Sequence, residues 1–234
     1  MCGMAPVLPP APGVAPGPVR DGRDVRWEAH RTRRRRQLVE AALRAIRKHG
    51  AGVGMDEIAA EGSTSKTVLY RHLGDRAGLY RAVVAAVDET ILGDLAEAAA
   101  GGRDVVERIG QMVRSYLELV ERDPEIYRFV VTRPLETQEG ADGDPVDHIT
   151  DRIAEQLAET LREHLDTTAD PAAALHAQVW AHGIVGMVRN VSDHWLASRS
   201  TGEDHPGADE VAAAVVALLR PALTPTDTTP GGRR

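Results

Sequence analysis

Along most of the chain, apolar residues recur every three or four positions, which is the spacing of one face of an α-helix. From this pattern we predict helices over residues 55–61, 66–73, 76–100, 104–121, 124–132, 146–164, 172–197 and 209–219, preceded by a basic helix that ends near His49. Glycine or proline, which stop helices, follows several of these segments. No segment reads as a convincing strand, so the predicted fold class is all-α.

The two shortest predicted helices lie close together in the sequence and are joined by a tight turn. In residues 55–61, Met55, Ile58 and Ala59 share one face, and Gly62 begins the turn. Ser65 is placed to cap the next helix. In that helix an inward apolar stripe leaves the polar and aromatic side chains outward, namely Lys66, Thr67, Tyr70, Arg71 and His72. Such a surface suits the DNA major groove, although a solvated helical hairpin has the same pattern.

Charge is distributed unevenly along the chain. The 234 residues have a formal net charge of −7. Residues 20–80 hold 14 Lys and Arg against 8 Asp and Glu, whereas residues 81–234 hold 14 against 27. A basic N-terminal module can therefore approach a polyanion if the acidic remainder faces away from it.

The ends of the chain and its single cysteine add little chemistry. Residues 1–22 are rich in Pro and Gly, and we expect them, like residues 224–234, to be loosely ordered. The leader is not a convincing signal peptide. Cys2 cannot form an internal disulfide, which indicates a cytoplasmic protein. No apolar run reaches the roughly 18 residues of a membrane span, so no membrane segment is predicted.

Residues 34–80 resemble the helix-turn-helix domain of the TetR family of bacterial transcriptional regulators. The matching segments are RRRQLVEAALRAIRKHG, MDEIAAE, SKTVLYRHL and GDRAGLY, in this order. The resemblance implies a DNA-binding domain over residues 23–80 and a larger helical regulatory and dimerisation domain over residues 81–223. Gly54, Thr64, Thr67 and Val68 depart from residues common in the family. The operator sequence therefore stays open, although the docking mode does not.

The resemblance also assigns roles within the helix-turn-helix. It implies that Lys66 and Thr67 meet base edges, that Arg71 reads a guanine or holds a phosphate, and that the other matching positions contact the DNA backbone. The predicted DNA-contacting residues are Arg34, Arg35, Ser65, Lys66, Thr67, Tyr70, Arg71, His72 and Arg76. The resemblance further implies that the partner is a double-stranded, palindromic operator bound by a homodimer.

In the family, the last two long helices pair across a two-fold axis as a four-helix bundle. Residues 172–197 and 209–219 take that place here. The predicted dimer interface consists of Val179, Gly183, Gly186, Met187, Asn190, Trp195, Val211 and Val215.

Several bulky apolar residues lie on helices that are predicted to surround a cavity in the C-terminal domain. Any one of them is more often plain core than ligand wall. Together they suit a mostly apolar small-molecule effector with few polar anchors, for which His176 and Arg128 are candidates. The predicted ligand-binding residues are Met112, Tyr116, Phe129, His176 and Trp180. We expect the helix that begins at Arg76 to carry the response to the DNA-binding end.

Catalytic motifs are missing from the sequence. There is no HExxH, GxSxG, glycine-rich phosphate loop or cysteine pair, and His176 and His182 are too far apart to form a metal face. We therefore predict no enzyme, metal or cofactor. The predicted function is a ligand-responsive regulator, a repressor by resemblance. The alternatives are a helical ligand-binding protein or enzyme without DNA binding, and an interaction protein whose basic end binds acidic proteins.

Overall fold

The computed structural model describes residues 22–131, 145–165, 171–199 and 205–224. Within these ranges the chain forms α-helices and no strand, which confirms the all-α prediction. In chain order the helices are α1 (Gly22–His49), α2 (Met55–Glu61), α3 (Lys66–Leu73), α4 (Arg76–Ala100), α5 (Val105–Arg122), α6 (Pro124–Val131), α7 (Pro145–Leu165), α8 (Pro171–Ser198) and α9 (Ala208–Leu223).

The predicted helix boundaries agree with the structure to within about two residues, except at the two ends of the described chain. The basic run before His49 is part of one continuous helix, α1, which begins at Gly22. The last helix was expected to stop at Leu219, but α9 passes through Pro221 to Leu223. Proline removes one backbone donor, and in the final turn that loss does not break the helix. The predicted leader and tail lie almost entirely outside the described residues.

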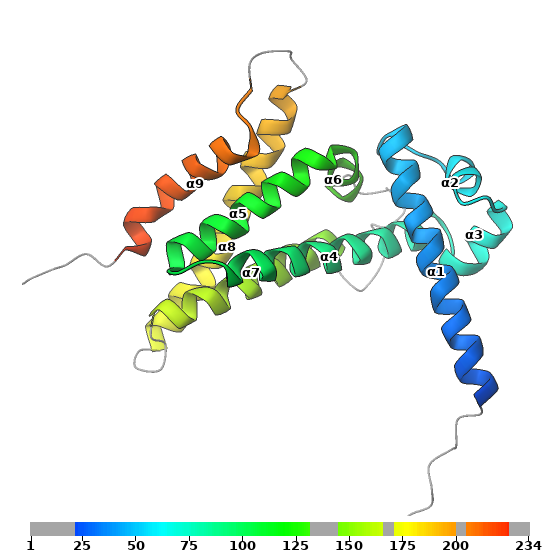
Figure 1. Ribbon diagram of the computed structural model, residues 1–234, viewed down its shortest axis with the longest axis horizontal. Helices are drawn as coiled ribbons and strands as arrows, with labels where there is room; N and C mark the ends of the chain where they lie inside the picture. Colours follow the sequence, from blue (N-terminus) through cyan, green and yellow to red (C-terminus); the bar gives the residue numbers. More distant parts are fainter. Residues whose placement is uncertain (1–21, 132–144, 166–170, 200–204, 225–234) are drawn as a thin grey trace, which may run out of the picture.

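The helices form two groups that are joined by α4. Figure 1 shows α1, α2 and α3 together at one end of the molecule and α4 running from them into the larger helical body. Within the body, α7 packs against α8, and α5 lies between α4 and α9. At the junction, α1 contacts both α4 and α6. The small α6 therefore lies where a change in the body can reach the first three helices.

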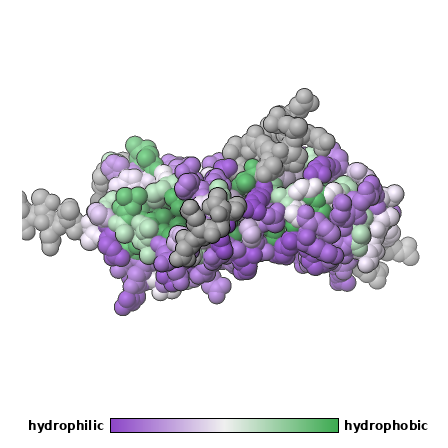
Figure 2. All heavy atoms as spheres, turned by 90° about the horizontal axis from the view of Figure 1, so that it is seen from above, coloured by the Kyte–Doolittle hydropathy of each residue, from purple (hydrophilic) through white to green (hydrophobic). Residues whose placement is uncertain are grey.

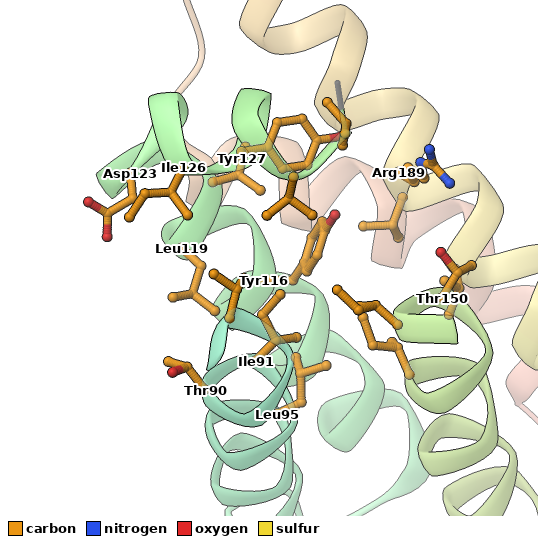
Figure 3. A pocket seen from close by; sticks show the side chains of 18 of the residues that line it. Thr90, Ile91, Leu95, Tyr116, Leu119, Asp123, Ile126, Tyr127, Thr150 and Arg189 are labelled. Carbon is orange, nitrogen blue, oxygen red and sulfur yellow. The ribbon is translucent and has the colours of Figure 1, made fainter. Parts of the chain in front are cut away.

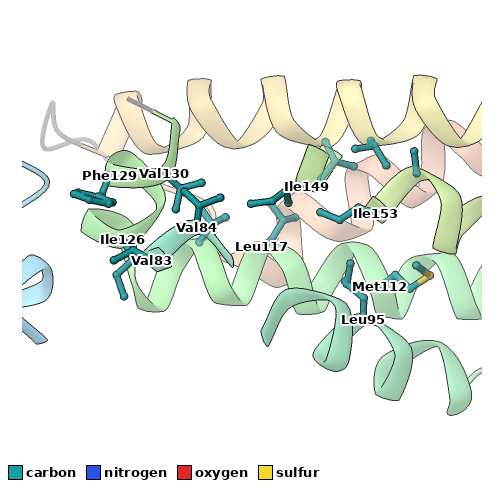
Figure 4. Packing of buried hydrophobic residues seen from close by; sticks show 14 of the residues in the cluster. Val83, Val84, Leu95, Met112, Leu117, Ile126, Phe129, Val130, Ile149 and Ile153 are labelled. Atoms are coloured by element: carbon teal, nitrogen blue, oxygen red, sulfur yellow. The ribbon is translucent and has the colours of Figure 1, made fainter. Parts of the chain in front are cut away.

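One apolar core runs through both groups. At the junction the fully buried Tyr80 of α4 donates a hydrogen bond from its hydroxyl to the Val130 carbonyl, 2.7 Å away. The Tyr80 ring lies 5.7 Å from that of Phe129, measured between centroids. Figure 4 shows Val83 and Val84 of α4 in the same apolar cluster as the α6 side chains. Burial of this kind is the main stabilising contribution to a helical fold.

The turn between α3 and α4 depends on a glycine. Asp75 caps α4, because its Oδ1 accepts a hydrogen bond from the Gly78 amide at 2.7 Å. A Cβ atom at Gly78 would lie 2.0 Å from the Leu73 carbonyl oxygen. Only glycine permits this approach, and it sets how α3 is held against the start of α4.

Candidate nucleic-acid interface and ligand cavity

Helix α3 presents a polar face on a buried apolar base. Leu69 and Leu73 are buried, whereas Tyr70 is 49% exposed. Lys66, Thr67 and Arg71 are also exposed. Ser65 caps the helix, its Oγ accepting a hydrogen bond from the Val68 amide at 3.4 Å. The predicted base-contacting and clamp residues of this helix, Lys66, Thr67, Tyr70 and Arg71, are therefore accessible.

Arg34 and Arg35 of α1 form hydrogen bonds with other residues of the chain. Arg35 donates a hydrogen bond to the His72 carbonyl at 2.7 Å, which joins α1 to the end of α3. Arg34 donates to Gln37 at 3.3 Å and to Thr64 at 3.4 Å. The structure thus places Arg34 and Arg35 beside the turn and α3, as an extension of the same surface.

Lys66 already has an acidic partner on α2. Its ammonium lies 2.6 Å from the Asp56 carboxylate, and this hydrogen bond raises the pKa of Lys66. Both side chains are exposed, so the pair is easily exchanged for another anion. To contact DNA, Lys66 must either leave Asp56 or bind Asp56 and the DNA at the same time.

Positive charge is concentrated around His72. Desolvation lowers the pKa of its imidazole, and the charges of Arg71, Arg34, Arg31 and His30 lower it further. The imidazole is therefore neutral at pH 7, and the arginines supply the charge. His72 and Arg76 are both half-buried. Arg76 lies at the N-terminus of α4, next to the Asp75 cap.

A groove beside this cluster contains residues that the sequence analysis did not assign. Trp27, His30 and Arg31 of α1 line it together with Arg71 and His72. Trp27 is 67% exposed. The dense arginines of this region were the available signal in the sequence, but only the continuous α1 brings His30 and Arg31 beside Arg71 and His72.

A mostly apolar cavity of about 170 Å³ lies at the junction of α1 with the body. Its walls come from α1, α4, α5, α6, α7 and α8, and Figure 3 shows the labelled wall residues from α4 to α8. The apolar lining includes Ile91, Leu95, Met112, Leu119, Ile126 and Ile153. An apolar cavity of this size accommodates roughly one ring-sized group without movement of its walls.

Two residues of α1, Leu43 and Arg47, belong to the cavity wall. Arg47 forms an ion pair with Asp123, which also accepts from Arg122 at 3.3 Å. The hydrogen bond with Arg47 lowers the pKa of Asp123, and the same bond raises the pKa of Arg47. The helix that supports α2 and α3 is thus part of the wall of the cavity.

The opposite side of the cavity has a second polar group. Tyr116, Tyr127, Thr150 and Arg189 line it. Burial raises the pKa of Tyr116 to about 12, so its hydroxyl stays protonated at neutral pH. The Tyr127 hydroxyl donates to Asp193 Oδ1 at 2.6 Å, and burial raises its pKa as well.

The structure places two of the five predicted ligand residues, Met112 and Tyr116, on the cavity wall. The other three, Phe129, His176 and Trp180, lie outside its lining. Phe129 packs against Tyr80 on another face of α6. His176 stacks on Trp180 at 6.0 Å, near the start of α8 and away from the α8 residues of the wall. The candidate anchor Arg128 instead pairs with Glu125.

The predicted dimer residues fall into two groups. Val179, Gly183, Gly186 and Asn190 lie exposed along one face of α8, and Met187 and Val211 are half-buried. Trp195 and Val215 are buried within the protomer, so little of either side chain is open to a partner. The indole N–H of Trp195 donates a hydrogen bond to the Pro206 carbonyl at 2.9 Å. This polar group therefore has a partner within its own protomer.

Neither a metal site nor a membrane-spanning helix is found in the part of the chain that the structure describes. In the described ranges, no group of three or more His, Cys, Asp or Glu side chains is arranged to hold a metal ion. Among the helices described, none is both long and apolar enough to cross a membrane.

Family models match both ends of the chain. The model described as "Bacterial regulatory proteins, tetR family" matches residues 38–83, and "Tetracyclin repressor-like, C-terminal domain" matches residues 91–233. The HTH-type transcriptional regulator Rv0472c of Mycobacterium tuberculosis is 34% identical over 187 residues, which cover 79% of this chain and 76% of the relative.

Two further similarities are less close in sequence or extent. The HTH-type transcriptional activator FasR of Mycolicibacterium smegmatis is 30% identical over 109 residues, 46% of this chain and 50% of FasR. The crystal structure of a TetR-family transcriptional regulator from Pectobacterium atrosepticum has a TM-score of 0.61 at 24% identity. The similarity covers 83% of this chain and 94% of that one, and it extends the shared fold over both helical groups.

Proposed function

The chain belongs to the TetR family of ligand-responsive, DNA-binding transcriptional regulators, and we propose that it is a homodimeric repressor released from a palindromic operator by a small, largely apolar effector. Residues 23–80 bind DNA in this proposal, and residues 81–223 bind the effector and the second protomer. The observation that carries the proposal is the shared wall: Leu43 and Arg47 of α1 line the same cavity as the body helices.

The DNA contacts divide into those that read bases and those that hold the backbone. Lys66 and Thr67, on the first turn of α3, are placed to meet base edges in the major groove. Arg34, Tyr70 and Arg76 supply affinity for the phosphate backbone. We add Arg31 to the backbone set, since it lines the groove next to Arg71.

The effector releases the protein from its operator by changing how α1 packs against the body helices. A ligand in the cavity touches α1, α4 and α6 together, and it meets the Arg47–Asp123 pair at one side. If the ligand binds more tightly to the arrangement that does not fit the operator, it shifts the population toward that arrangement. Helix α4 carries part of this response, and the α1–α6 contact supplies a second connection.

The second protomer docks on the outer face of α8 and on α9. Leu175 and Val179 of α8 and Leu218 of α9 are 58–68% exposed, an unusual exposure for large apolar side chains. A Cβ at Gly183 or Gly186 would meet nothing within 4 Å, so a partner helix can approach α8 closely there. Figure 2 shows apolar surface at the end of the body away from α1–α3.

The proposal also covers the location of the protein, its lack of catalysis and the sign of its regulation. The protein acts in the cytoplasm, where its DNA is; it has no catalytic activity of its own; and binding at the operator lowers transcription. FasR is an activator by name, so the sign of regulation is measured separately. A reporter gene behind the operator gives that sign.

A gel-shift series tests the proposal as a whole. The probe is DNA from upstream of the protein's own gene, titrated with the full-length protein at several salt concentrations. We expect affinity to fall steeply with salt and to prefer one palindrome over scrambled DNA. Salt-independent binding, or equal affinity for scrambled DNA, would contradict the DNA-binding role and favour the ligand-carrier or enzyme alternative.

A further inference from the structure

The charges on the cavity wall do not balance. Three arginines line it, Arg47, Arg122 and Arg189, but a single carboxylate, Asp123. Arg47 and Arg122 both pair with Asp123, at 2.6 Å and 3.3 Å respectively. For Arg189 the described residues provide no acidic side chain within ion-pair distance. Among the described residues, the cavity wall therefore has more positive than negative side chains, and Arg189 is the arginine without an ion-pair partner.

Arg189 lies on the side of the cavity opposite Asp123. Figure 3 shows Arg189 of α8 and Thr150 of α7 on this side, with the Tyr116 ring between them and the α6 end. Arg189 is half-buried, and its charge is close enough to Tyr116 and Tyr127 to oppose the rise of their pKa values. A cation beside an apolar cavity is poorly solvated, so an anion placed there is strongly favoured.

We propose that the ligand of this cavity is an apolar molecule with one anionic group, a carboxylate, and that Arg189 binds this group. The inference rests on the cavity being the effector site proposed above, and it assigns the chemical class of the effector. The apolar part is about the size of one ring or a short chain, because about 170 Å³ is open to it. It points away from Arg189 toward the apolar wall formed by α4 and α5.

Asp193 is the nearest alternative partner for Arg189, four residues further along α8. Its carboxylate accepts the Tyr127 hydroxyl at 2.6 Å, is exposed, and is not part of the cavity wall. Its negative charge raises the pKa of Tyr116, so it lies on the same side of the body. It reduces the field of Arg189 without occupying the place that the ligand takes.

Matched acids and amides test this assignment without DNA. Phenylacetate, 3-phenylpropanoate and hexanoate are each compared with the corresponding primary amide by calorimetric titration of the full-length protein at pH 7. We expect the best acid to bind about tenfold or more tightly than its amide, the difference between a charge-assisted and a neutral hydrogen bond. In Arg189→Gln the affinity for the acid should fall to that for the amide.

Two controls separate ligand binding from structural roles. Arg122→Gln removes a cavity arginine that already has Asp123, and it should keep the preference for acids. Arg189→Gln should keep the ligand-free melting temperature, since Arg189 forms no ion pair with a residue that the structure describes. Equal binding of acid and amide to the wild type, no binding of any acid, or an undiminished preference in Arg189→Gln would each overturn the assignment. Gel shifts report failure of the regulator function separately, because the titrations contain no DNA.

Discussion

Arg47 of α1 and Asp123 before α6 form a two-point ion pair across the junction of the molecule. The Arg47 Nε lies 2.6 Å from Asp123 Oδ1, and a second guanidinium nitrogen lies 3.2 Å from Oδ2. The neighbouring Glu125 accepts the Ala51 amide at 2.9 Å, so the start of α6 is attached to the C-terminal end of α1 twice. Both Arg47 and Asp123 line the cavity, so in the proposed function this contact connects the effector site with the DNA-binding helices.

Breaking this ion pair should weaken the effect of ligand binding on DNA binding. In Arg47→Ala we expect operator affinity without ligand to change little and the effect of a bound ligand on that affinity to shrink several-fold. The pair is partly exposed, so its loss should lower the free energy of unfolding by only about 0.5–1 kcal/mol. Fluorescence anisotropy with labelled operator measures the first effect and urea unfolding the second. A full ligand response in Arg47→Ala would remove the pair from the coupling.

The same pair predicts a pH dependence of stability. Asp123 has a folded pKa below its ordinary value of 3.8, chiefly through the Arg47 hydrogen bond. Its stabilising contribution is therefore complete above the unfolded pKa and disappears as the pH falls through the folded one. Asp123→Asn should lower the unfolding free energy near neutral pH and lose that difference in acid. A difference that stayed constant with pH would show that the charge of Asp123 is not responsible.

Helix α3 should separate specificity from affinity. Thr67→Ala is expected to weaken binding at one base pair of each half-site by about 1–3 kcal/mol, the cost of a lost base contact. Tyr70→Phe or Tyr70→Ala should instead weaken binding to all sequences alike. Competition between single-base variants of the operator distinguishes the two patterns. Selective loss at one base in the Tyr70 variants would reverse the assigned roles.

Arg31 should contribute one phosphate contact. In Arg31→Ala the slope of log affinity against log salt should decrease by about 0.9, with no change in sequence preference. Arg114→Ala is the matched control, because Arg114 pairs with Asp209 at 3.1 Å in the body. A slope unchanged from the wild type would place Arg31 away from the DNA.

Two glycines of α4 should respond oppositely to alanine. A Cβ at Gly78 would meet the Leu73 carbonyl oxygen at 2.0 Å, whereas a Cβ at Gly93 would meet nothing within 4 Å. Gly78→Ala should therefore destabilise by about 1–3 kcal/mol or more, and Gly93→Ala should stabilise by up to about 1 kcal/mol. Thermal unfolding of both variants measures this. Similar effects at the two sites would contradict the close packing of α3 on α4.

Local signals made the first helices predictable. Ser65 caps its helix as predicted, and Gly62 follows the end of α2. The cavity was harder to predict from the sequence, because an apolar stripe identifies the inward face of a helix but not the helix that packs against it. Phe129 faces Tyr80 while Ile126, on the same short helix, faces the cavity. Arg189 could not be predicted as a ligand contact, because that role depends on its lack of an ion-pair partner among the described residues, which only the fold shows.

Selection from random DNA tests the central claim most directly. Full-length protein is incubated with a random duplex pool, the bound DNA is sequenced, and the enriched site is footprinted. The account predicts a palindrome whose half-sites lie about 34 Å or a multiple apart, with two protomers bound; Tyr70→Ala should enrich the same palindrome with lower affinity. Enrichment of no sequence, or of a single half-site by one protomer, would contradict it.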